Sequence, residues 1–266
     1  MSSLISMPRQ DIATARHQPP HTTRSFLTAE WRWLVMVNFE VDPALLLPLA
    51  PAGTELDDFN GVTLMSLVGF RFLNTRVCGC RIPGHANFEE LNLRFYVRRR
   101  APEGWRRGVV FIKEIVPKRA VTLVARKVYG ENYLTLPMGH EIREEVVAGR
   151  TVRSCEYHWR LETRRNHLRL TTATDWVMPA EASLEQFIAE HYWGYTRLGD
   201  GQGLEYRVDH PPWKISPARQ VEMQCDAAIL YGQPLARYLE AAPLSAFLAD
   251  GSAVTVYRGT AMGLPR

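Results

Sequence analysis

Two stretches of this sequence place charged side chains where strand geometry can bring them together. Glu30 and Arg32 lie two residues apart in an extended run, so they share a strand face and can reach one cavity. Residues 89–94 bring two glutamates, an asparagine and an arginine onto an otherwise apolar strand. Such groups can hold an anionic ligand or exchange protons with it. Each stretch also has a structural interpretation, the first as a paired surface ion and the second as a rim charge.

A third candidate is His210, which opens the proline-rich turn that ends at Trp213. The ordinary pKa of an imidazole lies close to neutrality, so His210 can exchange protons at physiological pH. The structural interpretation is a packed turn, in which the histidine is hydrogen-bonded beside its prolines. The sequence leaves both interpretations open.

Most signatures of known chemistry are missing. The sequence has no Walker phosphate loop, no dinucleotide-binding glycine fingerprint, no zinc-binding helix and no nucleophile elbow. Cys78 and Cys80 flank Gly79, which is too short a spacing for the usual zinc pair, and no second pair follows. The sequence therefore predicts no metal site and no cofactor.

The composition is that of an ordinary globular protein, with 46 % apolar and 23 % charged residues over 266 positions. Only four of the 32 basic residues are lysines, and the 28 arginines are mixed with 28 acidic residues. That mixture argues against a nucleic-acid partner. No run approaches the roughly 18–20 apolar residues that a membrane span needs. We therefore expect no membrane contact and a cytoplasmic location.

The chain is expected to consist of a tail and one domain. Residues 1–25 contain three prolines and no apolar periodicity, which predicts a flexible tail that folding does not require. No linker interrupts residues 26–266, which we therefore interpret as a single domain. The sequence leaves a homo-oligomer open.

Short strand-like runs dominate that domain. Residues 91–98 alternate cleanly, with Leu91, Leu93, Phe95 and Val97 on one face. Other strands are expected at 31–41, 62–72, 108–116, 132–138, 141–148, 151–162, 167–175, 204–209, 219–231 and 252–259. The turn at residues 60–61 is expected to join 55–59 and 62–72 in a hairpin. These patterns predict a mainly β (α+β) fold with one mostly antiparallel sheet system.

A few helices should accompany the strands. Residues 118–129 have helical spacing, and Gly130 is suited to cap the C-terminus of that helix. Asp42 and Pro43 predict the start of a short helix through residue 49. Ser183 predicts the cap of a helix that ends near residue 192, and a last short helix is expected at 234–240.

Several segments, taken in order, resemble the YqjF-like family of unknown function. They include FLTAEWR at 26–32, VDPALL at 41–46, PAGTEL at 51–56, FEELNLRFYVR at 88–98, ARKVYG at 125–130, and residues 59–70, 192–197 and 210–213. The resemblance spans roughly residues 26–259. The family is similar to acetoacetate decarboxylase, which implies an antiparallel β-barrel with a few peripheral helices around a mostly apolar pocket.

In acetoacetate decarboxylase a pocket lysine forms a Schiff base with a keto acid, assisted by a second lysine, an arginine and glutamates. The resemblance places Arg32 at the pocket arginine and Glu90 at one pocket glutamate, while Met65 replaces another. Tyr133 stands where the nucleophilic lysine would be, and Leu134 replaces its neighbour. A tyrosine cannot form an iminium with a ketone, so the resemblance implies that Schiff-base decarboxylation is lost.

Three lysines lie close enough in the sequence to substitute for the missing nucleophile, namely Lys113, Lys118 and Lys127. Lys118 and Lys127 lie on or beside the helix at 118–129, which is expected to pack outside the barrel. The sequence leaves a relocated lysine open as an alternative.

Two hypotheses for function follow. In the first, the barrel binds a small organic acid and is an enzyme or a binding protein, with Arg32 on the anion and Tyr133 and Glu90 on the ligand. Arg32 and Glu90 would then lie within salt-bridge reach or share the anion, because an unpaired buried charge is costly. In the second, side chains fill the lumen, the partners are other proteins, Arg32 pairs with Glu30 at the rim, and Glu90 faces solvent.

Overall fold

The structure, a computed structural model, describes residues 25–198 and 202–262. The expected tail at 1–25 therefore lies outside the described residues except for Ser25, and its flexibility stays a prediction. Within the described ranges the chain is mainly β with a few short helices, as the alternating patterns predicted.

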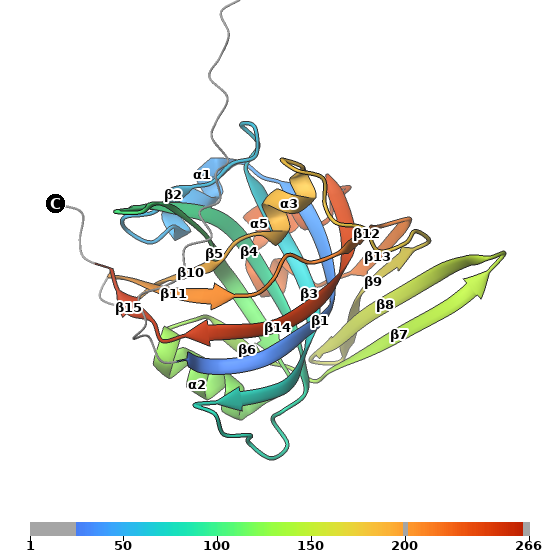
Figure 1. The fold of residues 1–266 in the computed structure, drawn as a ribbon, viewed down its shortest axis with the longest axis horizontal. Helices are drawn as coiled ribbons and strands as arrows, with labels where there is room; N and C mark the ends of the chain where they lie inside the picture. Colours follow the sequence, from blue (N-terminus) through green and yellow to red (C-terminus); the bar gives the residue numbers. More distant parts are fainter. Residues whose placement is uncertain (1–24, 199–201, 263–266) are drawn as a thin grey trace, which may run out of the picture.

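One sheet closes on itself and forms the body of the molecule (Figure 1). Its path is β14-β1-β3-β4-β5-β10-β11, and it closes because β11 also pairs with β14 at Val208↔Val256 and Asp209↔Thr255. Pairing around this ring is antiparallel except for the short parallel contact between β5 and β10. The bounds are β1 Ser25–Glu40, β3 Leu64–Val77, β4 Phe88–Ala101, β5 Gly104–Val116, β10 Trp193–Arg197, β11 Gly203–Asp209 and β14 Ser245–Tyr257.

Small elements extend or cover this ring. The additional strands are β2 Glu55–Leu56, β6 Tyr133–Thr135, β12 Ile215–Pro217 and β15 Thr260–Ala261. The helices are α1 Pro43–Leu46, η1 Leu47–Leu49, α2 Arg119–Tyr129, α3 Leu184–Ala189, α4 Ala227–Tyr231 and α5 Gln233–Leu239. None of the described helices is long and apolar enough to cross a membrane.

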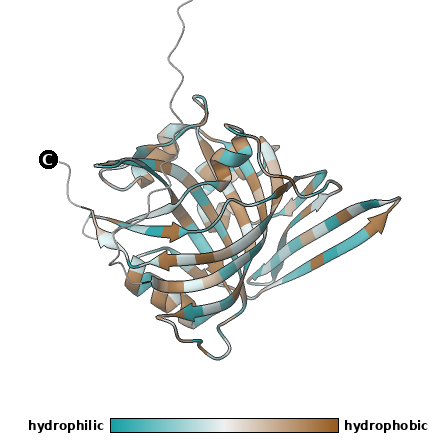
Figure 2. Ribbon diagram, viewed as in Figure 1, coloured by the Kyte–Doolittle hydropathy of each residue, from teal (hydrophilic) through white to brown (hydrophobic). Residues whose placement is uncertain are grey.

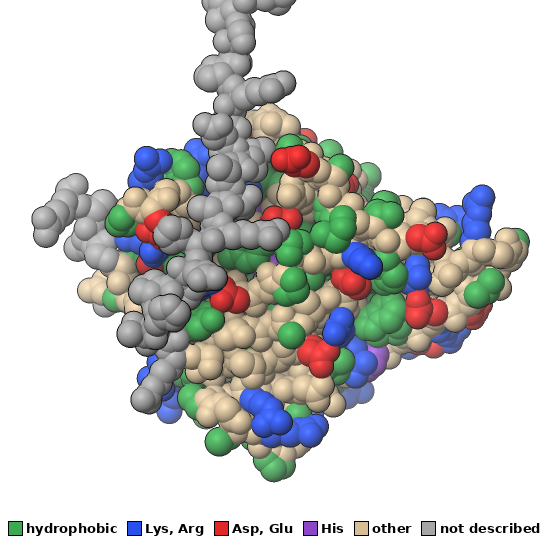
Figure 3. Space-filling view, in the orientation of Figure 1, with side chains coloured by type: hydrophobic (Ala, Val, Ile, Leu, Met, Phe, Trp, Pro, Cys, Tyr) green, Lys and Arg blue, Asp and Glu red, His purple; other side chains and the backbone are tan. Residues whose placement is uncertain are grey.

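A second sheet packs against the outside of the ring. Its order is β13-β9-β8-β7, and its bounds are β13 Gln220–Gln224, β9 Arg164–Thr172, β8 Arg150–Leu161 and β7 Met138–Val147. The β7–β8 hairpin projects from the body (Figure 1). Its turn contains Ala148 and Gly149 with φ of 51° and 77°, which matches a tight two-residue hairpin turn. Figure 3 shows side chains of both charge signs interspersed over this projection.

The two faces of the ring support two separate cores. Leu91, Leu93 and Phe95 of β4 belong to the core between the sheets, together with Tyr157 and Trp159 of β8. The opposite face of the ring carries a second core inside it, with Leu34, Val68, Phe70, Phe88 and Val109 among its members. Figure 2 shows the resulting alternation of hydrophobic and less hydrophobic residues along the strands.

Strand β1 carries a bulge that decides which of its side chains point inward. Trp33 has a positive φ of 58°, and the pairing of β1 with β3 shifts register between Arg32 and Val35. Trp31 and Leu34 consequently both line the interior, although they are three residues apart. The extra residue of a bulge reverses the alternation beyond it. Arg32 therefore lies on the outer face.

Several elements follow the sequence predictions. Asp42 caps α1, its side chain accepting a hydrogen bond from the amide of Ala44 at 2.9 Å. Ser183 caps α3 by accepting from the amide of Gln186 at 3.2 Å, although the helix ends at Ala189. Gly130 ends α2 in the left-handed conformation at φ 68°. Local capping chemistry was sufficient to place these starts and stops.

Other predictions were wrong. Residues 55–56 pair with β4 and not with β3, although the tight turn between Phe59 and Val62 forms as expected. The strand predicted at 219–231 ends at Gln224, and residues 227–231 are the helix α4. Helix α2 covers one end of the ring, with Val121 and Ala125 facing the interior, and so does not pack wholly outside it. In each case long-range packing overrode the local pattern.

Candidate functional site

A cavity of about 190 Å³ lies inside the ring. Its wall is mostly apolar, with aromatic side chains that include Trp31, Phe70 and Phe88. Ile82 and Val124 also line it and are 43 % and 39 % exposed, which places the opening between α2 and the loop after β3.

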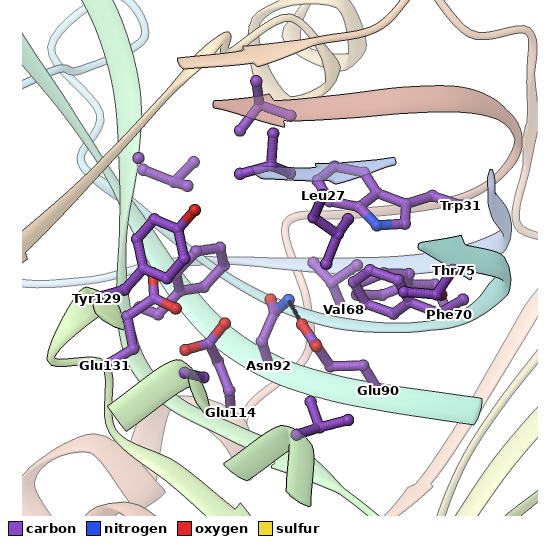
Figure 4. A pocket seen from close by; sticks show the side chains of 18 of the residues that line it. Leu27, Trp31, Val68, Phe70, Thr75, Glu90, Asn92, Glu114, Tyr129 and Glu131 are labelled. Carbon is purple, nitrogen blue, oxygen red and sulfur yellow. Dashed lines mark hydrogen bonds between the residues drawn. The ribbon is translucent and has the colours of Figure 1, made fainter. Parts of the chain in front are cut away.

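Polar side chains gather at one part of the wall (Figure 4). Strand β4 contributes Glu90, Asn92 and Arg94, which alternate with the buried leucines and so point into the cavity. Asn92 is paired in register with Glu114 of β5, and Glu114 is paired with Tyr133 of β6. Three adjacent strands therefore bring Asn92, Glu114 and Tyr133 into one row across the sheet.

Glu90 is buried and its hydrogen-bond partners are neutral. Its Oε1 accepts from Nδ2 of Asn92 at 3.2 Å, and its Oε2 accepts from the hydroxyl of Tyr133 at 3.1 Å. Burial raises the pKa of Glu90 to about 8, although these two hydrogen bonds act to lower it. Glu90 is therefore mostly protonated at neutral pH.

Glu114 and Glu131 form a second acidic group a short way along the wall. Both side chains line the cavity, and Figure 4 shows both directed into the same space. Burial, and then the neighbouring Glu131, raise the pKa of Glu114 well above its usual range. Burial raises the pKa of Glu131 to about 7. Because like charges repel, ionisation of Glu131 disfavours ionisation of Glu114.

Two tyrosines complete this acidic region. The hydroxyl of Tyr206 donates to Oε1 of Glu131, and that of Tyr133 donates to Glu90. Burial raises the pKa of both tyrosines well above the usual range, so both remain protonated donors. The region consists of three carboxyl groups and two hydroxyl groups that can pass protons between neighbours.

Arg94 is the charged group on the other side of Asn92. Its side chain is buried, its Nη2 donates to the backbone oxygen of Ile188 at 3.3 Å, and its guanidinium lies 5.7 Å from the ring centre of Tyr96. Its Nε is buried without a hydrogen-bond partner among the described residues. An arginine is charged at every physiological pH. Arg94 therefore brings a positive charge to the cavity wall, with no carboxylate partner among the described residues.

Two histidines lie near Arg94. His191 contacts Asp57 at 3.4 Å and packs against Tyr96 with the two rings tilted by 42°. His210 stacks on Trp213 with ring centres 4.2 Å apart. Burial lowers the pKa of each to about 4. Both are neutral at physiological pH, so they can donate or accept a hydrogen bond but add no charge.

The structure brings three of the four predicted site residues together. Glu90, Tyr133 and His210 line the same cavity. Arg32 is not among the lining residues, because the bulge at Trp33 places it on the other face, where its Nε donates to Glu30 at 3.0 Å. The expected pairing of Arg32 with Glu90 does not form. The ligand-binding roles of the other three stay predictions.

Sequence reasoning missed Glu114 and Glu131 as site residues and did not single out Arg94. Glu114 is a lone carboxylate in the apolar run 108–116, which was a usable signal. The face of β5 that Glu114 occupies could not be predicted, because β5 bulges where it pairs with Leu93 and Arg94 of β4 and the register shifts there. Glu131 lies in a loop that gives no periodicity. Neither feature could be placed in the cavity without the pairing of distant strands.

None of the four lysines lines the cavity. Lys113 lies on the outer side, where its Nζ donates to the backbone oxygen of Leu230 and approaches the ring of Tyr231. Lys127 and Lys214 are exposed, and Lys118 lies at the start of α2.

Comparison with known proteins agrees with this architecture. The family DUF2071, described as an uncharacterized conserved protein, matches residues 28–253. The protein YqjF of Bacillus subtilis (strain 168) is 26 % identical over 191 residues, covering 71 % of this chain and 74 % of YqjF.

Solved structures show the same fold at low identity. The enduracididine biosynthesis enzyme MppR, complexed with pyruvate, superposes with a TM-score of 0.61 at 14 % identity, covering 95 % of this chain and 94 % of MppR. Acetoacetate decarboxylase from Legionella pneumophila superposes with a TM-score of 0.60 at 12 % identity and 98 % coverage of both chains. The chain therefore belongs to the DUF2071 family, and its YqjF-like sequence has the fold of the acetoacetate-decarboxylase-like superfamily.

Proposed function

We propose that this protein binds a small organic acid in the cavity, with the carboxylate of the ligand on Arg94. We further propose that it acts on that acid by proton transfer and not through a lysine. The observation that carries the proposal is the buried guanidinium of Arg94, which has no carboxylate partner among the described residues and an Nε without any partner. A buried charge left unpaired is strongly disfavoured, and a bound anion would pair it.

The layout of β4 suggests how such a ligand would lie. Residues two apart on one strand face are about 7 Å apart. A carboxylate on Arg94 would therefore put the next two or three carbon atoms beside Asn92 and Glu114, which share a register position. The small, mostly apolar cavity suits an acid of a few carbon atoms.

The similar proteins support the keto acid as the ligand class. MppR was solved with pyruvate, and a second similar structure is an acetoacetate decarboxylase. Both names concern small oxo acids. At 12–14 % sequence identity the similarity shows a shared fold and not a shared ligand. The ligand class of this chain is therefore part of our proposal.

Binding can be measured by isothermal titration calorimetry with pyruvate and 2-oxobutyrate. We expect Arg94→Gln to weaken binding by about 100-fold, since a buried charge pair is lost. Arg71→Gln is the matched control, because Arg71 also has a buried Nε without a partner but does not line the cavity. Equal affinity in wild type and R94Q, or no binding of either acid to the wild type, would overturn the proposal.

The lysine-free cavity leads to a second expectation. Incubation with acetoacetate and then borohydride should leave no covalent adduct, because Tyr133 stands where the resemblance places the nucleophile and no lysine lines the cavity. Intact-protein mass spectrometry measures this directly. A stoichiometric adduct on Lys113, Lys118 or Lys127 would contradict it.

The alternative, a filled barrel that interacts only with proteins, has less support. A filled lumen would leave no space beside the polar residues, whereas the cavity borders Glu90, Glu114 and Arg94 together.

A further inference from the structure

Three buried carboxyl groups in one small cavity require an explanation. Glu90, Glu114 and Glu131 are each at most 8 % exposed, and no ion pair links any of them to a basic group among the described residues. Structural glutamates at this depth are normally paired with cations. Nothing in the packing of the ring requires three acids at this place.

The nearness of Glu114 and Glu131 restricts their protonation. Both side chains line the cavity and are directed into the same space (Figure 4). The charge of an ionised Glu131 disfavours ionisation of Glu114. The pair can therefore hold a proton at the cavity wall, beside the space that a ligand would occupy.

Glu90 lies on the other side of Asn92. It is held by hydrogen bonds from Asn92 and Tyr133, and no ion pair joins it to a basic group among the described residues. A neutral carboxyl group in an apolar site can donate a proton to an oxygen that becomes negative during a reaction. Asn92 therefore has an acidic neighbour on its own strand, Glu90, and another across the sheet, Glu114.

We propose that the Glu114–Glu131 pair removes and returns the proton on the carbon beside the carbonyl group of a bound oxo acid, while Glu90 protonates the carbonyl oxygen. This inference rests on the proposed function, since Arg94 must hold the acid. The protein would then interconvert the keto and enol forms without a covalent intermediate.

The step balances without any oxidant or reductant. The carbon–hydrogen bond breaks, its proton goes to the carboxylate of the pair, and its electrons form the carbon–carbon double bond. The carbonyl π electrons move to the oxygen, which takes a proton from Glu90. The reverse step restores all three groups, and exchange of the pair with solvent replaces the hydrogen on carbon.

The test is proton exchange in deuterated water, followed by proton NMR of the C3 hydrogens of pyruvate and 2-oxobutyrate. We expect the wild type to accelerate loss of these signals over buffer. Glu114→Gln and Glu131→Gln should slow the enzymatic exchange by 100-fold or more, the usual contribution of a general base. Glu89→Gln is the matched control, because Glu89 is the next residue on β4 but bonds His140 outside the cavity.

Titration calorimetry on the same samples separates the two ideas. Wild-type protein that binds the acids but exchanges no protons overturns this inference and leaves the proposed function standing. Protein that binds neither acid overturns both. If a glutamine variant fails to fold, the Glu131→Asp variant replaces it, because aspartate keeps the charge but has a side chain one carbon shorter. This variant should still bind the acid but should no longer accelerate hydrogen exchange at C3. Wild-type exchange rates in folded E131D and E114Q proteins would also overturn the inference.

Discussion

Glu90 and Glu156 are buried to nearly the same extent, 2 % and 3 % exposed, yet they behave in opposite ways. Glu156 lies on β8 of the outer sheet and accepts from Nε of Arg169 at 2.8 Å and from Arg165 at 3.2 Å. Burial acts to raise the pKa of Glu156, but the hydrogen bond and charge of Arg169 hold it below the usual value. Glu90 has only neutral partners and a pKa of about 8.

The difference shows what the two regions are built for. The outer sheet neutralises its acids with arginine, which fixes them as carboxylates and supports the packing of β8 on β9. The cavity forms no ion pair with its acids among the described residues, and the arginine that lines it, Arg94, has no carboxylate partner there. A site that must move protons needs acids whose pKa lies near the working pH.

The largest expected effect concerns Glu90. Its folded pKa is raised above the unfolded value, so its contribution to stability is complete below pH 4.5 and is lost as the pH rises to about 8. The Glu90→Gln variant has no ionisable group at this position and so does not lose stability in this way. The melting temperature of the variant minus that of the wild type should therefore rise by ~10 °C between pH 5 and pH 8.5.

Differential scanning fluorimetry of the two proteins across this range measures the gap. The difference between variants cancels the contribution of His191 and His210, which titrate in both. A constant gap would show that Glu90 is already ionised in the folded protein.

A smaller effect of opposite sign is expected for Glu156→Gln. The folded pKa of Glu156 is lowered, so its stabilisation is present above pH 4.5 and disappears as the pH falls below that value. Because Arg165 and Arg169 are partly exposed, the loss at pH 7 should be about 1 kcal/mol, or about 2–4 °C. Thermal unfolding at pH 7 and pH 3.5 tests it, and a gap that widens at low pH would contradict it.

The smallest expected effect is that added salt changes the stability of the outer sheet but not that of the cavity. Salt screens exposed charge pairs more than buried groups, and the Debye length falls to about 3 Å at 1 M. Added sodium chloride should therefore shrink the stability gap of E156Q by about half while leaving the pH-dependent gap of E90Q unchanged. Equal sensitivity of both gaps would mean that Glu90 is reached by solvent.

Much of the fold could be predicted because strand alternation is local. Cys155, Tyr157 and Trp159 alternate along the run 151–162 that was predicted as a strand, and all three are buried against the ring. The apolar face of 91–98 was found in the same way. The closing contact of β11 with β14 could not be predicted, because it joins residues about 48 positions apart through only two pairs.

The family resemblance marked two residues that line the cavity, Glu90 and Tyr133, while their ligand-binding roles stay predictions. The inward position expected for Arg32 was wrong because one residue, Trp33, adopts a positive φ and reverses the alternation. The bulge could not be predicted from the residue type, because tryptophan has no preference for a positive φ. Glu114 was missed for a similar reason, because β5 also bulges where it pairs with β4.

The sequence by itself determined the class of fold, the ends of several helices, and the division of β4 into an apolar and a polar face. Only the tertiary structure decided that the polar face of β4 points into a cavity and that Glu114, Glu131 and Arg94 share it. The physical reason is that alternation relates a side chain only to its own strand. The side of the sheet that becomes the interior depends on strand bulges and on pairings between distant segments, whose energies no local pattern contains.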